Sequence, residues 1–492
     1  MLIQFIIRTT FIKVLGNEYT GVSGLFTDIL HVLSLMELGL DSSMVFSLYK
    51  PLLNRDSEKI SALLNFYRKA FNLIGVLVLA AGVGCVPFLR YIVKDVPNIS
   101  EDIRFIFLMY VAATGFSYFL IYKSILLRAD QKSRIISNWS TIVTVAETVV
   151  EVILLVIFRK FVLYLIVRLI ATVGRNLILS FITTRKYKDY FRNKEARLSS
   201  GETRSLLRDL ACLTVYNVSG VIINSTDSIF ISAFVGTVEV AIIGNFTLIL
   251  NSLRTGINQI VNATKPSIGN LAATADAEKQ ELVFNRMNFI SFFVSCFCCT
   301  CLTVLLNPFV GEIWFNESYK IGMPIIAALV INFFIAIMVF PVESFRTANG
   351  LFVQGWMRPA IMAVMNIVLD LFMGKQWGIL GIFLATTISR TLTQVWYDPY
   401  LIYKIVFKKN PKKYFFDYIL YALITAGCCA AAFLLANAVR LPNRYLNFLY
   451  QMVVAGCLPL LTVAVIFRKS DGFRYITRSF PKIKAKLLRK RS

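Results

Sequence analysis

Apolar residues occur along the chain in repeated blocks of about 20 residues, separated by short polar stretches. A helix of that length crosses a hydrocarbon core about 30 Å thick. A membrane-spanning strand would instead alternate apolar and polar residues over about 10 positions. The blocks are continuously apolar, so the pattern predicts an all-α integral membrane protein. The predicted segments are 1–15, 20–49, 70–93, 104–126, 135–158, 161–184, 207–234, 240–262, 288–310, 322–342, 357–374, 378–402, 414–437 and 446–467.

These segments make about 14 transmembrane helices, of which the first is short. Residues 1–15 supply about half of a spanning helix. We therefore expect either a misassigned start or a truncated first helix.

The distribution of Lys and Arg supports this count and sets the orientation. With the N-terminus in the cytoplasm, 37 of the 52 basic residues fall in cytoplasmic loops or in the tail, and nine fall on the opposite side. Cytoplasmic loops carry such an excess in membrane proteins. Both termini are therefore predicted to be cytoplasmic. The net charge of +24 follows from this topology, so we do not expect nucleic acid as a partner.

An internal repeat divides the chain. Residues 15–33 match 235–253 at seven of 19 positions, and 147–154 lie over 366–373 at nearly the same shift. The repeat unit has an even number of helices, so both halves enter the membrane in the same direction. Transporters use such parallel repeats as two lobes around a central cavity. We expect an N-terminal lobe at 1–184, a basic cytoplasmic linker at 185–206, a C-terminal lobe at 207–402, two additional helices at 414–467 and a basic cytoplasmic tail at 468–492.

Three basic residues inside the spans are candidates for substrate binding. Charges in the bilayer are costly and usually face a cavity or a partner. Arg8 and Lys13 lie in the first predicted helix, and Arg254 lies in the eighth. A guanidinium can bind two phosphate oxygens at once, so these residues predict a cationic cavity for a phosphorylated headgroup. The alternative is an ion pair, or a side chain that reaches the interface. Structural pairing is favoured for the other three: Arg168, Arg175 and Arg390.

Acidic residues inside the spans suggest ion coupling. Glu147 and Glu151 are four residues apart and share a helix face, and Asp370 matches Glu151 in the repeat. A proton or sodium ion could use these carboxylates, although pairing with the intramembrane bases is the favoured alternative. Asp227 follows three polar residues and is expected either to line the cavity or to cap a broken helix.

Catalytic chemistry has few candidates in the sequence. There is no Ser/His/Asp set, no phosphate-cradling glycine loop and no HExxH motif. His31 stands alone, and we expect a structural contact rather than a proton relay. The cysteines crowd apolar helices, as small hydrophobic residues do, so neither a disulfide framework nor a metal site is expected. The sequence thus predicts a transporter without catalytic residues, cofactors or metals.

Three opening stretches carry a family resemblance. They are RTTFIKVLGNEYTGVSGLFTDILHVLSLMELGL, SLYKPLLNRDSEKISALLNFYRK and LLRADQK. From residue 8 through the second repeat, the chain resembles Wzx-type polysaccharide flippases of the MOP (MATE-like) exporter superfamily. The resemblance implies a two-lobed helical bundle in the bacterial inner membrane. It also implies transfer of undecaprenyl-pyrophosphate-linked oligosaccharide to the outer leaflet for O-antigen, capsule or exopolysaccharide synthesis.

The same resemblance implies roles for particular residues and partners. In the related lipid II flippases, basic residues of the first and eighth helices face the cavity, which implies that role for Arg8 and Arg254. Further expected partners are anionic lipids at the basic tail, a polysaccharide polymerase and glycosyltransferases. Two alternatives stay open. A MATE-like drug exporter would need an acidic, aromatic cavity, and a membrane glycan polymerase would need larger extracytoplasmic loops.

Overall fold

The computed structural model describes residues 2–34, 40–93, 99–193, 195–204, 219, 222, 225–351, 354–355, 357–439 and 441–477. Within this part of the chain the regular structure is helical and no strand occurs. The chain divides into two compact units, Met1–Gly244 and Asn245–Ser492, which are described separately.

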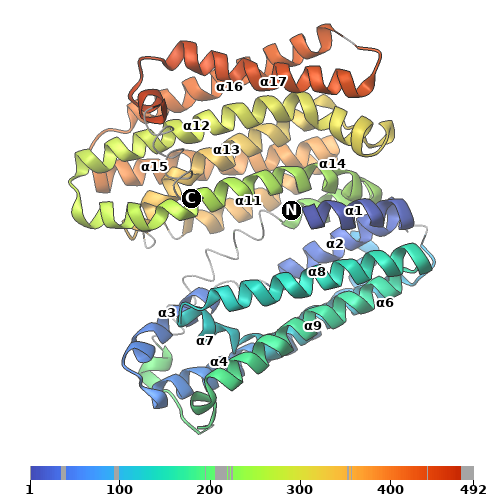
Figure 1. Cartoon of the computed structure of the whole chain (residues 1–492), viewed down its shortest axis with the longest axis vertical. Helices are drawn as coiled ribbons and strands as arrows, with labels where there is room; N and C mark the ends of the chain where they lie inside the picture. Colours follow the sequence, from blue (N-terminus) through green and yellow to red (C-terminus); the bar gives the residue numbers. More distant parts are fainter. Residues whose placement is uncertain are drawn as a thin grey trace, which may run out of the picture. The chain divides into compact units, whose positions relative to one another are not determined.

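The N-terminal unit is a helical bundle (Figure 1). Helix α6 packs against α4 and α9, and α8 packs against α9 and α1. Asp56 caps α4 by accepting the Lys59 N–H at 2.9 Å, and Asp102 caps α6 in the same way. The helices are α1 (Leu2–Leu15), α2 (Asn17–Leu33), α3 (Leu40–Leu53), α4 (Ser57–Cys85), α5 (Leu89–Ile92), α6 (Ile103–Ile121), α7 (Ser124–Ala129), α8 (Ser133–Phe158) and α9 (Phe161–Lys186).

The segment after α9 is folded onto the start of α4. The Ser61 hydroxyl donates to the Tyr190 carbonyl at 2.9 Å. The Asn65 amide donates to the carbonyls of Asn193 and Ala196 at 3.0 and 3.1 Å. These contacts satisfy backbone acceptors that no helix uses. The predicted linker at 185–206 therefore includes residues that belong to the N-terminal bundle.

The C-terminal unit is built around α13. In the most apolar stretch of α13, 72% of the residues are buried, compared with 11% in that of α8 in the first unit. The last two helices, α16 and α17, pack against each other and against α12 (Figure 1). The helices are α11 (Thr237–Thr274), which begins in the first unit, then α12 (Ala277–Pro308), α13 (Met323–Ala348), α14 (Met357–Arg390), α15 (Trp396–Ile402), α16 (Lys412–Ala438) and α17 (Arg444–Phe467).

Helix α14 folds back on itself at Gly378. This glycine has φ 56° and ψ −133°, a conformation outside the helical region. Asn366 Nδ2 donates to Thr386 Oγ1 at 3.3 Å. In a straight helix, 20 residues would separate these groups by about 30 Å. The two arms therefore lie side by side, as expected from the predicted break between residues 374 and 378.

The structure confirms the all-α membrane architecture. The described residues contain ten helices or helix runs long and apolar enough to span a bilayer, including Met357–Phe407 with its reversal. The total of 14 stays a prediction, as do the lobe boundaries. The predicted segment 20–49 corresponds to two helices, α2 and α3, and the start of 207–234 lies outside the described residues.

The internal repeat is visible in where helices begin. Gly16 directly precedes α2, which starts at Asn17, and Gly236 directly precedes α11, which starts at Thr237. These starts are separated by the same shift that aligns the two sequences. The matched acids also agree, because Glu151 is 4% exposed and Asp370 is 0% exposed. The repeat is therefore a repeat of local structure.

Candidate functional site

Arg8 is held against the beginning of α11. Its Nη2 donates to the Ala241 carbonyl at 2.9 Å, and its side chain is half-buried. Gly244 lies beside it, since a Cβ added there would be 2.6 Å from Arg8 Nη2. Glycine thus provides the space that the guanidinium fills. The structure places the charge of Arg8 against protein within the N-terminal unit.

The other two candidate substrate-binding residues of this unit differ in exposure. Lys13 is exposed in the last turn of α1. Asp227 is half-buried in the helical residues 225–234, where the preceding Ser225 and Thr226 are buried. The helix continues through Asp227, so this residue does not cap a break within the described range.

The predicted coupling acids of α8 lie among bases of α9. Glu147 Oε2 is 3.1 Å from Arg175 Nη2, and both side chains are less than one-third exposed. Arg168 is an electrostatic neighbour of both Glu147 and Glu151. The predicted structural pairing of Arg175 is confirmed. The result favours the alternative in which these acids balance intramembrane bases.

Arg168 is surrounded by tyrosine hydroxyls. Its Nη1 lies 3.4 Å from Tyr164 Oη and 3.5 Å from Tyr110 Oη, and its guanidinium sits 5.1 Å from the centre of the Tyr110 ring. Tyr110 Oη in turn is 2.6 Å from Ser23 Oγ. This chain of contacts connects α2, α6 and α9 through polar groups. Such an interior network fixes helix positions and stabilises a charge away from water.

Asp370 has different surroundings in the C-terminal unit. It is fully buried one turn after Asn366, whose amide contacts Thr386 across the reversal of α14. The Oδ1 atom of Asn366 is buried without a hydrogen-bond donor. Carboxylate, amide and hydroxyl oxygens are ligands suited to hard cations, and a carboxylate can also carry a proton. The sequence predicted Asp370 and the break near residue 378, but not Asn366 and Thr386, because the break does not say which side chains of the two arms face each other.

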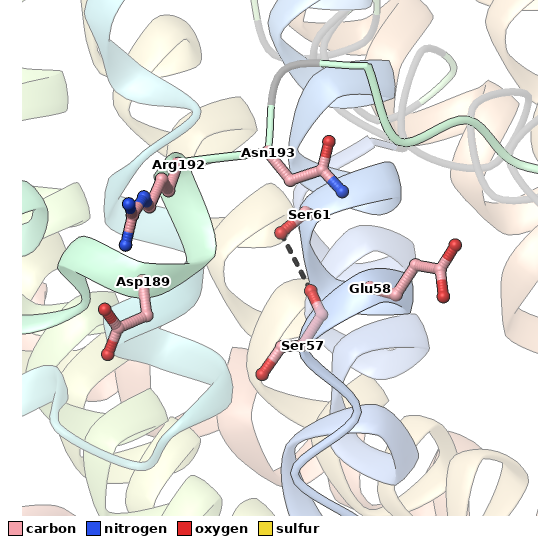
Figure 2. Close-up of a pocket in the computed structure, with 6 residues that line it drawn as sticks. All are labelled: Ser57, Glu58, Ser61, Asp189, Arg192 and Asn193. Atoms are coloured by element: carbon pink, nitrogen blue, oxygen red, sulfur yellow. Dashed lines mark hydrogen bonds between the residues drawn. The ribbon is translucent and has the colours of Figure 1, made fainter.

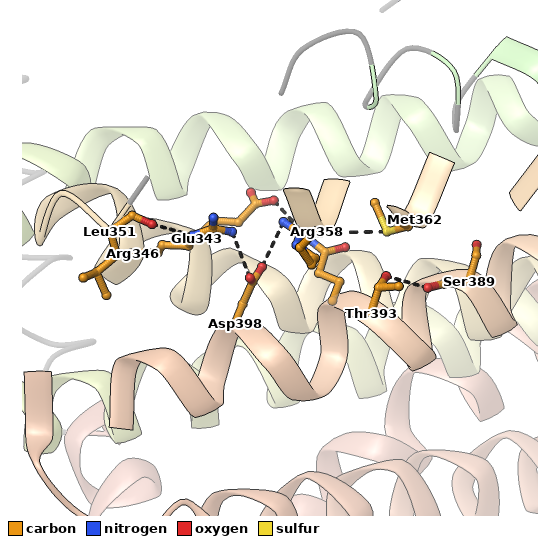
Figure 3. A network of polar contacts seen from close by, with 9 residues as sticks. Glu343, Arg346, Leu351, Arg358, Met362, Ser389, Thr393 and Asp398 are labelled. Atoms are coloured by element: carbon orange, nitrogen blue, oxygen red, sulfur yellow. Dashed lines mark hydrogen bonds and ion pairs between the residues drawn. The ribbon is translucent and has the colours of Figure 1, made fainter. Parts of the chain in front are cut away.

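Arg254 lies half-buried on α11, facing a charged cluster on α13, α14 and α15. Its electrostatic neighbour is Glu343, which also interacts electrostatically with Lys265 and Arg358. Below we call Glu343, Arg346, Arg358 and Asp398 the buried charge cluster (Figure 3). Asp398 accepts from Arg346 Nη1 at 2.8 Å and lies 3.0 Å from Arg358 Nη2.

Two bases of this cluster are buried although they lie near helix ends. Arg346 and Arg358, which belong to the cytoplasmic set of the topology count, have side chains that are only 2% and 7% exposed. Arg346 lies in the last turn of α13, and Arg358 is the second residue of α14. Both arginines pair with Asp398, which offsets part of the cost of burying their charges. The available signal was Asp398 itself, an acid inside a predicted span that needed partners.

A pocket of about 630 Å³ lies at the start of α4, where the segment after α9 packs against it (Figure 2). Its charged groups are two carboxylates, Glu58 and Asp189, and the guanidinium of Arg192. The excess of acid makes it unsuited to phosphate. Its lining is Ser57, Glu58, Ser61, Asp189, Arg192 and Asn193.

Comparison with known proteins identifies the family. A model of the family described as "Polysaccharide biosynthesis protein" matches residues 1–272, more than half of the chain. The chain belongs to this polysaccharide biosynthesis family. No curated protein matches its sequence.

Solved structures show which fold this chain has. It is similar to a lipid II flippase MurJ in an inward closed conformation, with a TM-score of 0.68, 14% identity, and coverage of 95% of this chain and 96% of that one. It is also similar to an inward-facing MATE family transporter of the MOP superfamily, with a TM-score of 0.58, 12% identity, and coverage of 80% and 93%. The protein therefore has the MurJ- and MATE-like fold of a multi-pass membrane protein. At these identities the likeness establishes fold alone.

Proposed function

We propose that this protein is a flippase for lipid-linked glycans. It would move undecaprenyl-pyrophosphate-linked oligosaccharide repeat units from the cytoplasmic to the outer leaflet of a bacterial inner membrane. The proposal rests on one observation: a chain of the polysaccharide biosynthesis family holds basic residues inside its spans, above all Arg8 and Arg254.

The physical problem is the polar headgroup. Moved through lipid unaided, its charges and hydroxyls would lose their water at a cost of many kcal/mol. Arg8, Arg254 and, more weakly, the exposed Lys13 and half-buried Asp227 would supply polar contacts in place of that water. Alternating access then exposes the headgroup first to one side of the membrane and then to the other, as in transporters built from two repeats.

Two sources of energy fit the charges. The membrane potential favours outward movement of an anion by about 2.3 kcal/mol per charge per 100 mV. The buried carboxylate of Asp370 would add coupling to a sodium ion or a proton. Glu147 and Glu151 are the weaker candidates for coupling, because bases already balance them.

The deciding experiment is replacement of each arginine in cells that depend on this protein for surface polysaccharide. Arg8→Ala and Arg254→Ala are each expected to reduce surface polysaccharide at least tenfold at a normal protein level. Arg90→Ala is the control, because Arg90 is exposed at the end of the α4–α5 run, where its guanidinium contacts Tyr91. Unchanged polysaccharide in both test variants, with normal protein level, would remove the cationic-site proposal.

A second candidate is a cation-coupled exporter of small molecules, which the likeness to MATE transporters favours. In that case deletion of the protein would sensitise cells to cationic drugs and leave surface polysaccharide intact. Measuring both phenotypes in one deletion strain separates the two functions.

A further inference from the structure

The two acids of the buried charge cluster are held in different ways. Asp398 is enclosed by Arg346 and Arg358, with both ion pairs at 3.0 Å or less. Glu343 is only half-buried, and Gln394 Nε2 donates to its Oε1 at 3.3 Å. Among the described residues, no Lys or Arg nitrogen lies within ion-pair distance of Glu343. Asp398 is therefore fixed by its partners, whereas Glu343 is a loosely held charge.

The charged neighbours of Glu343 among the described residues come from several helices. They are Arg254 and Lys265 on α11, Arg358 on α14 and Asp398 on α15, with Arg346 one turn away on α13 itself. Arg254 and Lys265 are 11 residues apart, which is close to three helical turns, so they share one face of α11 about 16 Å apart. Arg254 is half-buried and Lys265 is exposed. An anion that approaches this face meets two bases whose nearby negative charge is Glu343.

The balance of charge around Glu343 fits a particular ligand. Four bases surround two acids in this region, which leaves an excess of two positive charges. Asp398 balances one of the two charges of Arg346 and Arg358, and Glu343 balances one of the two charges of Arg254 and Lys265, so one positive charge of the excess lies on the α11 face. A diphosphate has enough negative charge and enough acceptor oxygens to engage both bases. A Glu343 that formed a close ion pair with one of these bases would compete with the diphosphate much more strongly.

We propose that Glu343 is the resident counterion of Arg254 and Lys265, which the diphosphate of the lipid-linked substrate displaces on binding. This inference rests on the proposed flippase function and adds Lys265 and Glu343 to its substrate site. When the headgroup is absent, Glu343 lowers the positive potential of the α11 face. When the headgroup leaves, Glu343 again neutralises the two bases, which promotes release. Glu343 is a positioning residue, since it acts on substrate through the bases.

The test measures affinity for undecaprenyl pyrophosphate without sugar, using the full chain in nanodiscs. Glu343→Gln keeps an acceptor for Gln394 and removes the charge. It is expected to tighten binding at least about fivefold, because one like charge near the ligand is lost. The gain should fall below about twofold when Arg254 and Lys265 are both alanine, since the bases that Glu343 balances are then gone. Glu312→Gln is the matched control, because Glu312 pairs with Lys320 at 2.9 Å elsewhere in the same unit.

Three results would overturn the inference. The first is unchanged or weaker binding by a Glu343→Gln protein that melts at the wild-type temperature. The second is the same gain in the background that lacks both bases, and the third concerns Lys265→Ala. Glu343→Ala is a second variant and should tighten binding in the same way, whatever the fate of the Gln394 contact. Lys265→Ala changes an exposed residue, and should weaken binding about threefold; an unchanged affinity there would also count against the proposal.

The failure of the inference is distinguishable from failure of the proposed function. If wild-type protein does not bind the lipid diphosphate more tightly than uncharged undecaprenol, or if Arg254→Ala has no effect, the flippase site itself is wrong. If Arg254→Ala weakens binding and Glu343→Gln changes nothing, the site stands and the counterion role of Glu343 is removed.

Discussion

The two units bury charge by different means. In the N-terminal unit, Glu147 and Arg175 form one ion pair that keeps some exposure, and Arg168 is surrounded by tyrosine hydroxyls. In the C-terminal unit, Asp398 is fully buried between two arginines. A partly exposed pair can rearrange at small cost, whereas a buried triad must stay complete. The difference indicates that Asp398 fixes helices α13, α14 and α15, while the charges of α8 and α9 are freer to change partners.

The matched acids of the repeat make the contrast sharper. Glu151 shares its surroundings with Glu147 and Arg168, whereas Asp370 is fully buried one turn from Asn366, whose amide donates to Thr386 across the reversal of α14. An acid thus stands at matched positions of the two halves, and the residues around it differ.

The largest expected effect is on stability, from Asp398→Asn. Removing one partner of a buried ion pair costs about 3–5 kcal/mol, and here two arginines lose their counterion. Thermal unfolding of the purified chain in detergent would measure the loss. The matched control is Lys409→Ala, which breaks the surface pair with Glu281 and should cost less than about 1 kcal/mol. Equal losses of stability in the two variants would contradict the distinction between the buried pairs of Asp398 and partly exposed ion pairs.

The second prediction compares the matched acids in transport. Asp370→Asn is expected to lower surface polysaccharide at least tenfold and to remove its dependence on sodium or proton gradients. Glu151→Gln should lower it less than threefold, because the proposed role of Glu151 is to balance bases. Both variants should be present in the membrane at the wild-type level. Reversed effects would show that the N-terminal acid is the coupling residue.

The third prediction concerns the partly exposed ion pair of Glu147 and Arg175. Arg175→Ala and Glu147→Gln should each destabilise the chain by about 1 kcal/mol, since the pair is neither fully exposed nor fully buried. The double variant should cost less than the sum of the single variants. Additive losses in thermal unfolding would mean that the 3.1 Å contact contributes nothing to stability.

The smallest expected effect is at the segment folded onto α4. Hydrogen bonds from Lys59 and from the Ser199 N–H hold the pKa of Glu202 below its usual value. The stabilisation is therefore complete above the ordinary Glu pKa and is lost as the pH falls through the lowered value. Glu202→Gln should increase hydrogen exchange at residues 195–204 at pH 7 by less than about fivefold, because the pair is solvent-exposed. At a pH below the lowered value, the variant and the wild type should exchange alike.

Hydropathy predicted most helices because spanning lipid dictates length and apolarity. It also predicted the break that Gly378 makes in α14. It placed the start of α4 late, since the polar first turns from Ser57 onward pack against a segment more than 120 residues away. Such contacts between distant residues leave no periodic trace in the sequence.

The candidate site was predicted less completely for the same reason. Arg254 and Asp370 stood out as charges within apolar segments. Arg346 and Arg358 did not, because a base near a helix end is normally in a loop, and their burial depends on Asp398 far along the chain. Glu343 directly follows the predicted segment 322–342, and its relation to Arg254 and Lys265 depends on how the helices pack.

The close fit of Arg8 against Gly244 has an evolutionary consequence. A methyl group at position 244 would lie 2.6 Å from Arg8 Nη2, so the guanidinium would have to move away from its contact with the Ala241 carbonyl. In descendants of this chain, a larger residue at position 244 should accompany a different placement of the side chain at position 8.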